Sequence, residues 1–124
     1  MDLNQVTVPC TDYDESVRFY KTLGLTQIVD SPPRYARFET ATGTTLSIHV
    51  VEDSGATSQI VIYFEVQDVD LEVRRLEHLG LHVDSKPTDT DWLWREAYLR
   101  DPAGNLLCIF HAGENRRFPP WRVS

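Results

Sequence analysis

Two short segments of the chain, residues 3–8 and 60–66, are read as alternating apolar segments. Alternation with a period of two is typical of a β-strand that buries one face, so each segment predicts a half-buried strand. After each segment, apolar residues recur every three or four positions, as Val17, Tyr20 and Leu23 do in the first half. This spacing places them on one side of a helix, so each half is expected to begin with a strand followed by an amphipathic helix.

Both predicted helices carry start and stop signals. Asp12 opens a capping-box pattern in the first half, and Asp68 or Asp70 takes the same part in the second. Gly24 and Gly80 stand just beyond the helices, where the chain commonly needs the left-handed conformation that glycine adopts without strain. Each helix is therefore expected to be about three turns long.

Three further strands are expected in each half. Residues 101–104, Asp-Pro-Ala-Gly, have the composition of a type I turn and should join the last two strands as a hairpin. Residues 52–58 are expected to be a linker. Residues 112–124 are expected to be an extended tail with two prolines, whose Phe118 and Trp121 pack across the body or onto a partner subunit. The predicted strands cover residues 26–29, 34–40 and 44–51 in the first half and 82–86, 94–100 and 105–111 in the second.

The two halves repeat one pattern. Residues 12–25 and 68–81 are identical at seven of fourteen positions at an offset of 56. A weaker match at an offset of 61 relates residues 36–49 to residues 97–110. Internal repetition fixes the architecture before local propensities are considered, so both halves should form the same supersecondary unit.

That unit is a βαβββ module, with module 1 over about residues 1–52 and module 2 over about residues 59–111. One helix cannot cover both faces of a four-stranded sheet, so each module must bury its other face, most economically against a second copy of itself. We therefore expect an α+β fold, a single domain over residues 1–124. Its two tandem modules should form curved mixed sheets around a concave cavity.

The composition limits the partners. Among 124 residues, 19 Asp and Glu against 12 Lys and Arg give a formal net charge of -7, which disfavours nucleic acids and anionic membranes. Because the sequence lacks an apolar run of roughly 20 residues and the features of a signal peptide, we expect a cytoplasmic location. In that reducing compartment Cys10 and Cys108 are expected to be free thiols.

Three segments carry a family likeness: residues 4–8, residues 12–25, and residues 100–107, which read Arg-Asp-Pro-Ala-Gly-Asn-Leu-Leu. They resemble the vicinal oxygen chelate superfamily, which includes glyoxalase I, bleomycin resistance proteins and extradiol dioxygenases. The resemblance implies paired βαβββ modules around a ligand cavity, usually in a homodimer. In the enzymes of that superfamily, four inward-pointing side chains, from the first and last strands of each module, hold a divalent metal.

The resemblance assigns the four metal-ligand positions to Gln5, Ser47, Val61 and Cys108. Gln is an accepted ligand in some glyoxalases, but Ser is a poor ligand, Val cannot coordinate a metal, and Cys replaces the usual Glu. We therefore expect the standard site to be missing and no cofactor to be needed. A displaced divalent metal site on His49, Glu65 and Cys108 stays open, because strand alternation turns these residues toward the cavity.

Aromatic side chains supply much of the expected ligand surface. Trp92 and Trp94 stand just before a predicted strand, where the resemblance implies a loop over the cavity mouth. The residues expected to contact a ligand are Gln5, Thr7, Ser47, His49, Val61, Tyr63, Trp92, Trp94, Cys108 and Phe110.

These observations favour a homodimeric small-molecule binding protein of the glyoxalase/bleomycin resistance type that lacks the standard metal ligands. The alternative is an enzyme, a lactoylglutathione-lyase-like lyase, isomerase or transferase acting on a small carbonyl or thiol adduct. Its catalytic candidates are His49, Glu65, Tyr63 and Cys108. A third alternative is an interaction module with a closed interior. The ligand, the reactivity of Cys108 and the arrangement of the dimer stay open at this point.

Overall fold

The computed structural model describes residues 1–52 and 60–123. The chain folds into two compact units, each described by itself: unit 1 comprises Met1–Gln59 and Asp101–Asn105, and unit 2 comprises Ile60–Arg100 and Leu106–Ser124. Residues 53–58 of the predicted linker lie outside the described residues. Among the helices described, none is long and apolar enough to cross a membrane.

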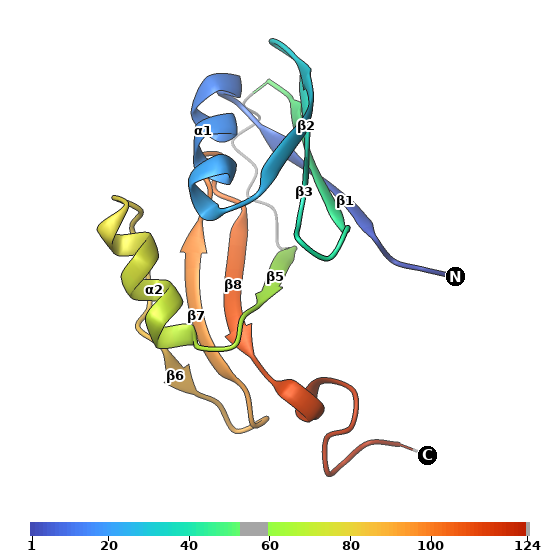
Figure 1. Cartoon of the computed structure of the whole chain (residues 1–124), viewed down its shortest axis with the longest axis vertical. Coiled ribbons are helices and arrows are strands. Elements are labelled where there is room, and N and C mark those ends of the chain that lie inside the picture. Colours follow the sequence, from blue (N-terminus) through green and yellow to red (C-terminus); the bar gives the residue numbers. More distant parts are fainter. Residues whose placement is uncertain (53–59, 124) are drawn as a thin grey trace. The chain divides into compact units, whose positions relative to one another are not determined.

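Unit 1 is a four-stranded mixed sheet with one helix. Its elements are β1 (Gln5–Cys10), α1 (Tyr13–Leu23), β2 (Thr26–Ser31), β3 (Tyr35–Glu39) and β4 (Thr45–Val50). The strand order is β1-β4-β3-β2, in which β1 and β4 are parallel and the other pairs are antiparallel (Figure 1). The helix lies against β3 and β4.

Unit 2 has the same plan. Its elements are β5 (Val61–Glu65), α2 (Val69–His78), β6 (Thr88–Asp89), β7 (Arg95–Arg100), β8 (Leu106–His111) and the short 3-10 helix η1 (Gly113–Arg116). The strand order is β5-β8-β7-β6, with β5 and β8 parallel, and α2 lies against β7 and β8. The α+β class and the two tandem βαβββ modules are thereby confirmed.

The strand registers reproduce the repeat. Ser47 of β4 is the partner of Arg37 on β3, and Cys108 of β8 is the partner of Tyr98 on β7. Both members of the second pair lie 61 residues after their counterparts, as the weaker sequence match requires. The offset therefore identifies positions that play the same geometric part in the two units.

The predicted helix ends are confirmed. The Asp12 carboxylate accepts a 3.0 Å hydrogen bond from the backbone N–H three residues on, and Asp68, rather than Asp70, does the same for α2 at 3.0 Å. Gly24 and Gly80 have φ values of 120° and 92°. At these angles a side chain would be strained, so glycine ends both helices.

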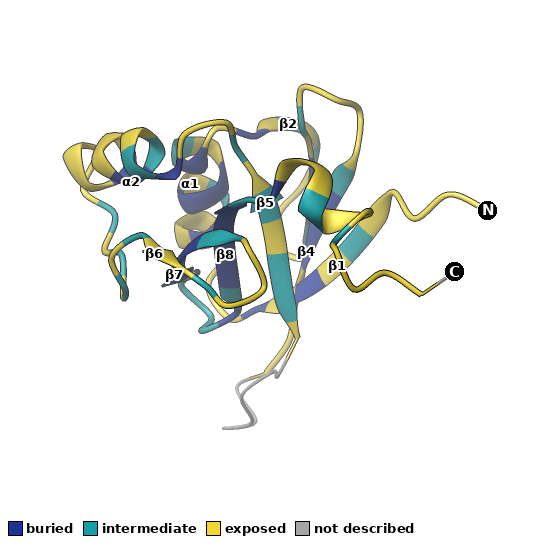
Figure 2. Cartoon of the chain, turned by 90° about the horizontal axis from the view of Figure 1, so that it is seen from below, coloured by how far each residue is buried: buried dark blue, intermediate teal, exposed yellow. Residues whose placement is uncertain are grey.

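Each helix covers one face of its sheet. In unit 1 this face carries the buried Phe38 and Ile48, with the Phe38 ring 5.6 Å from that of Tyr20. In unit 2 the buried Leu99 and Ile109, 61 residues further along the chain, hold the same positions. Figure 2 shows β8 as a buried strand over most of its length. Along each strand, the residues next to these helix-facing residues point to the opposite face of the sheet. We call this the distal face of each unit.

The strand predicted over residues 82–86 is wrong, because β6 begins only after this segment. The backbone N–H groups of Asp84 and Ser85 both donate to the Tyr98 carbonyl, at 2.8 and 3.4 Å. The Tyr98 N–H in turn donates to the Ser85 hydroxyl at 3.0 Å. A side chain thus takes the place of a strand carbonyl, and the segment is held to β7 without a regular ladder.

The turn at residues 101–104 is confirmed by a 2.9 Å hydrogen bond between its first and last residues. The Asp101 side chain is 5% exposed, and its carboxylate accepts hydrogen bonds from four donors. They are the Tyr20 hydroxyl at 2.6 Å, the Ala103 N–H at 3.0 Å, and the backbone and side-chain N–H groups of Asn105 at 2.8 and 2.7 Å. This network lies entirely in unit 1.

The tail does not start as the extended segment expected over residues 112–124. It begins with η1, because the Glu65 carboxylate accepts the Ala112 and Gly113 N–H groups at 2.8 and 2.9 Å and so turns the chain. Phe118 and Trp121 do not pack across the body in this structure, since they are 57% and 56% exposed.

Candidate functional site

The distal face of unit 1 holds a chain of polar side chains. Gln5 donates to the Ser47 hydroxyl at 2.7 Å, Ser47 hydrogen-bonds the Tyr35 hydroxyl at 2.7 Å, and Arg37 donates to Tyr35 at 2.9 Å. Thr7, also on this face, accepts a longer hydrogen bond of 3.4 Å from Gln5. The structure therefore brings together Gln5, Thr7 and Ser47, as predicted, and adds Tyr35 and Arg37 to them.

Ser47 sits at the middle of this chain and is completely buried. The Ser47 hydrogen bond and the Arg37 guanidinium lower the pKa of the Tyr35 hydroxyl, while burial opposes them. The Ser47 oxygen is therefore committed to two protein partners, and metal coordination would require breaking that arrangement.

His49 lies on the same distal face, with Tyr35 as its strand partner. Its side chain is exposed, and within the described residues of unit 1 no side chain hydrogen-bonds its ring. His49 therefore has an exposed ring that the described side chains of its own unit do not engage.

The distal face of unit 2 is aromatic. The Trp94 and Phe110 rings are stacked at 4.7 Å, and Tyr63 meets them edge-on at 5.9 and 5.6 Å. Phe110 is 3% exposed, whereas Tyr63 is 49% exposed. We call Tyr63, Trp94 and Phe110 the aromatic wall. It combines a buried base with a ring that can be touched from outside, as a surface for a flat apolar ligand requires.

Cys108 and Val61 belong to this wall. Cys108 is completely buried in a hydrophobic cluster with Phe110, and Val61 packs against that cluster. Burial raises the pKa of the Cys108 thiol to about 12, and the negative charge of Glu96 adds to the rise. Since the thiolate is the reactive and metal-binding form, burial disfavours both reaction and metal coordination at Cys108.

Glu96 is a functional candidate that was not predicted from the sequence. Its side chain lies on the distal face beside the wall and is 6% exposed. The Trp92 indole N–H donates to one carboxylate oxygen at 3.0 Å, and the Tyr98 hydroxyl donates to the other at 3.0 Å. In the described part of unit 2, no Arg, Lys or His forms an ion pair with this carboxylate.

A signal for Glu96 does exist in the sequence. The offset of 61 matches Tyr35 with Glu96, Arg37 with Tyr98 and Ser47 with Cys108. Alternation along β7 puts Glu96 and Tyr98 on the face opposite Ala97 and Leu99, which is the distal face. The repeat therefore could have pointed to a polar cluster at these positions in both units.

The carboxylate of Glu65, one of the catalytic candidates, is engaged by the start of the tail. Its carboxylate accepts the two tail N–H groups described above, and the Arg116 guanidinium lies 3.6 Å away. These contacts make Glu65 an anchor for η1, which occupies the oxygens that a base or a metal ligand would need.

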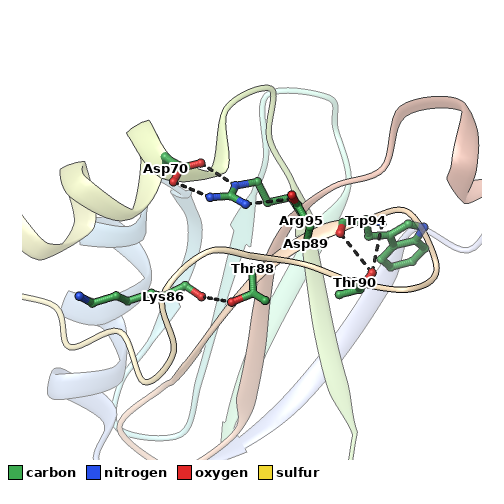
Figure 3. A network of polar contacts seen from close by, with 7 residues as sticks. All are labelled: Asp70, Lys86, Thr88, Asp89, Thr90, Trp94 and Arg95. Carbon is green, nitrogen blue, oxygen red and sulfur yellow. Dashed lines mark hydrogen bonds and ion pairs between the residues drawn. The ribbon is translucent and has the colours of Figure 1, made fainter.

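The hairpin that carries Trp92 and Trp94 is braced at its base. Figure 3 shows the Arg95 guanidinium between two carboxylates, bonded to Asp70 at 2.7 and 2.9 Å and to Asp89 at 2.9 Å. The hydrogen bond from Arg95 lowers the pKa of the Asp70 carboxyl. Thr90 and Trp94 close the hairpin through reciprocal hydrogen bonds of 2.8 and 3.2 Å. The hairpin is therefore tied to α2 through Arg95 and closed at Trp94.

The four family positions do not fit a divalent cation. Gln5 and Ser47 bond to each other, Val61 offers no donor atom, and the Cys108 thiol is disfavoured as a thiolate. Across residues 1–52 and 60–123, no group of three or more His, Cys, Asp or Glu is arranged to hold a metal ion. The displaced site on His49, Glu65 and Cys108, which draws on both units, stays a prediction.

Two surface hollows lie away from these residues. One of about 530 Å³ in unit 1 lies between α1 and β2 and is lined by Lys21 and residues 25–30. The other, of about 170 Å³ in unit 2, lies between α2 and residues 83–87. Neither contains a predicted site residue, so the distal faces remain the candidate surfaces.

Known proteins share this fold. YraH of Bacillus subtilis (strain 168), an uncharacterized protein, is 32% identical over 89% of this chain and 98% of its own length. A glyoxalase/bleomycin resistance protein/dioxygenase from Nocardioides superposes with a TM-score of 0.79 at 23% identity, covering 100% of this chain and 90% of that one. A bleomycin-binding protein solved in complex with bleomycin gives 0.74 at 18% identity, with 90% and 98% covered.

The family assignment rests on the whole pattern. The model of the Glyoxalase/Bleomycin resistance protein/Dioxygenase superfamily matches residues 2–109, which include both modules and the turn at residues 101–104. The chain therefore belongs to the glyoxalase/bleomycin resistance protein/dioxygenase superfamily.

Proposed function

We propose that this protein binds a small organic molecule on its distal faces and needs no divalent metal at the four family positions. One observation carries the proposal: in unit 2, where the family resemblance places metal ligands, Val61 and Cys108 are built into the aromatic wall. A donor pair has been replaced by an apolar surface with a half-exposed ring, which suits an apolar or aromatic ligand.

The comparison with the bleomycin-binding protein supports the same proposal, because that protein holds a small molecule on this fold. The proposal includes a homodimer in the cytoplasm. It is supported by the family resemblance and by the exposure of Phe118 and Trp121, which a partner subunit would cover. The proposal includes no nucleic-acid partner, because the net charge of -7 disfavours binding to nucleic acids.

A thermal-shift screen tests the proposal. Cationic aromatic compounds, thiol conjugates and carbonyl compounds are added to purified protein in the presence of a chelator. A cognate ligand at about 100 times its Kd should add about 2.7 kcal/mol to the free energy of unfolding and raise the Tm. Stabilisation that appears only after a divalent metal is added would contradict the proposal.

The enzyme alternative is tested with the same compounds by following their consumption. His49 is the candidate to replace, because its ring is exposed and uncommitted within unit 1. Turnover that is lost in His49→Ala, while the unfolding transition stays unchanged, would replace the binding proposal by a lyase, isomerase or transferase.

A further inference from the structure

Glu96 is hard to explain by stability. A carboxylate taken out of water loses favourable solvation, and hydrogen bonds from uncharged donors replace only part of that solvation. Glu96 is 6% exposed and has two neutral donors, Trp92 and Tyr98, with no cation paired to it in the described part of unit 2. A buried negative charge without a counter-charge is the kind of arrangement that binding sites maintain.

The surroundings of Glu96 suit a positively charged ligand. Tyr98, which donates to Glu96, packs against the same hydrophobic cluster as Trp94, and Trp94 stacks on Phe110. Burial, together with the neighbouring Cys108 and Glu96, raises the pKa of the Tyr98 hydroxyl, which therefore stays protonated and donating. Carboxylate and aromatic rings are the two groups that attract organic cations, through charge and through cation–π contact.

The backbone next to Trp92 is strained. Leu93 has a φ of 68°, a left-handed conformation that costs a leucine energy, and its side chain is 48% exposed. The strained residue directly follows Trp92, which is 47% exposed and whose N–H covers one oxygen of Glu96. Strain of this sort persists where the surrounding structure enforces it, which is often at ligand sites.

We infer that Glu96 is the anchor for an organic cation, a protonated amine on a flat aromatic body, whose ammonium group replaces the Trp92 N–H on the carboxylate. The inference deepens the proposed function and rests on it. The exchange replaces a neutral donor by a positively charged one and supplies the counter-charge that the described part of unit 2 does not provide. The aromatic body of the ligand then lies on the aromatic wall, where Tyr63 is the accessible ring.

The test compares two probes of nearly equal shape by calorimetry: 2-naphthylmethylamine, which is protonated at neutral pH, and 2-naphthalenemethanol, which is neutral and still donates a hydrogen bond. The wild-type protein is expected to bind the amine at least about tenfold more tightly than the alcohol, because only the amine adds the attraction of opposite charges to its hydrogen bond with the Glu96 carboxylate. Equal binding of both probes would overturn the role of Glu96 but leave the proposed function standing. Binding of neither probe would count against both.

A variant arm assigns the preference to one residue. Glu96→Gln keeps the shape of the side chain and removes its charge, so the amine should lose about tenfold in affinity while the alcohol changes by less than about twofold. Glu77→Gln, which makes the same charge change at an exposed position on α2, is the matched control and should leave both affinities unchanged. An amine preference that survives in folded Glu96→Gln would contradict the inference. The wild-type comparison decides the matter if this variant does not fold.

Discussion

Replacing Asp101 by Ala is expected to lower the free energy of unfolding by at least about 3 kcal/mol. The Asp101 carboxylate is 5% exposed and accepts four hydrogen bonds, including the 2.6 Å bond from the fully buried Tyr20 hydroxyl. Each buried donor left without an acceptor costs about 1–3 kcal/mol. Asn105, which Asp101 orients, also donates to the Pro9 carbonyl at 2.8 Å, so the change would loosen the link from the turn to β1.

Urea unfolding curves measure this loss, with Tyr20→Phe and Asp101→Asn as companions. Tyr20→Phe removes one donor together with its bond and should cost less than Asp101→Ala. Asp101→Asn keeps one acceptor oxygen and should fall between wild type and the alanine variant. A loss below about 1 kcal/mol in Asp101→Ala would show that the turn is not held to unit 1 in the way described.

Replacing Phe110 by Ala is expected to cost about 3–5 kcal/mol of stability, as large-to-small changes of buried aromatic residues do. Phe110 is 3% exposed and stacks on Trp94 at 4.7 Å. Tyr63→Ala removes a ring that is 49% exposed and should cost only about 1 kcal/mol or less. The two rings are 5.6 Å apart, so the contrast separates the support of the aromatic wall from its accessible surface.

The same pair of variants separates stability from binding. A ligand found in the screen should bind folded Tyr63→Ala at least about tenfold more weakly, because stacking on an aromatic ring would be lost. Phe110→Leu, which fills most of the space, should restore much of the stability lost in Phe110→Ala. Unchanged binding to Tyr63→Ala would place the ligand elsewhere.

The fold was predictable because repetition adds information that local propensity lacks. The offset of 61 ties Ser47 to Cys108, so a register found in one module applies to the other. The N-cap at Asp68 and the left-handed Gly80 mark the second helix just as Asp12 and Gly24 mark the first. These signals are local and strong, and no distant contact competes with them.

The sequence of residues 82–86 alone does not show that this segment forms no strand. The parallel with residues 26–29 of the first half favours a strand here, but the Ser85 hydroxyl takes the Tyr98 N–H that a strand carbonyl would otherwise accept. A hydrogen bond between segments thirteen residues apart decided the outcome. Residues 82–86 on their own do not show that the Ser85 hydroxyl will replace a backbone carbonyl as the acceptor.

The candidate site was predictable as a surface but not in its chemistry. Alternation correctly grouped Val61, Tyr63, Cys108 and Phe110 on one face. Glu96 was missed because a charged residue in a strand is usually solvated, whereas here Trp92 and Tyr98 enclose it. The engagement of the Glu65 carboxylate was not predictable either, since only the folded tail shows that backbone N–H groups donate to it.

Metal analysis of protein purified without an affinity tag or chelator tests whether the protein binds its ligand without a divalent metal. The measurement is repeated on His49→Ala and Cys108→Ala. We expect substoichiometric metal in all three proteins, with ligand binding unaffected by a chelator. Stoichiometric metal in the wild type that both substitutions remove would contradict metal-free ligand binding and establish a displaced metal centre.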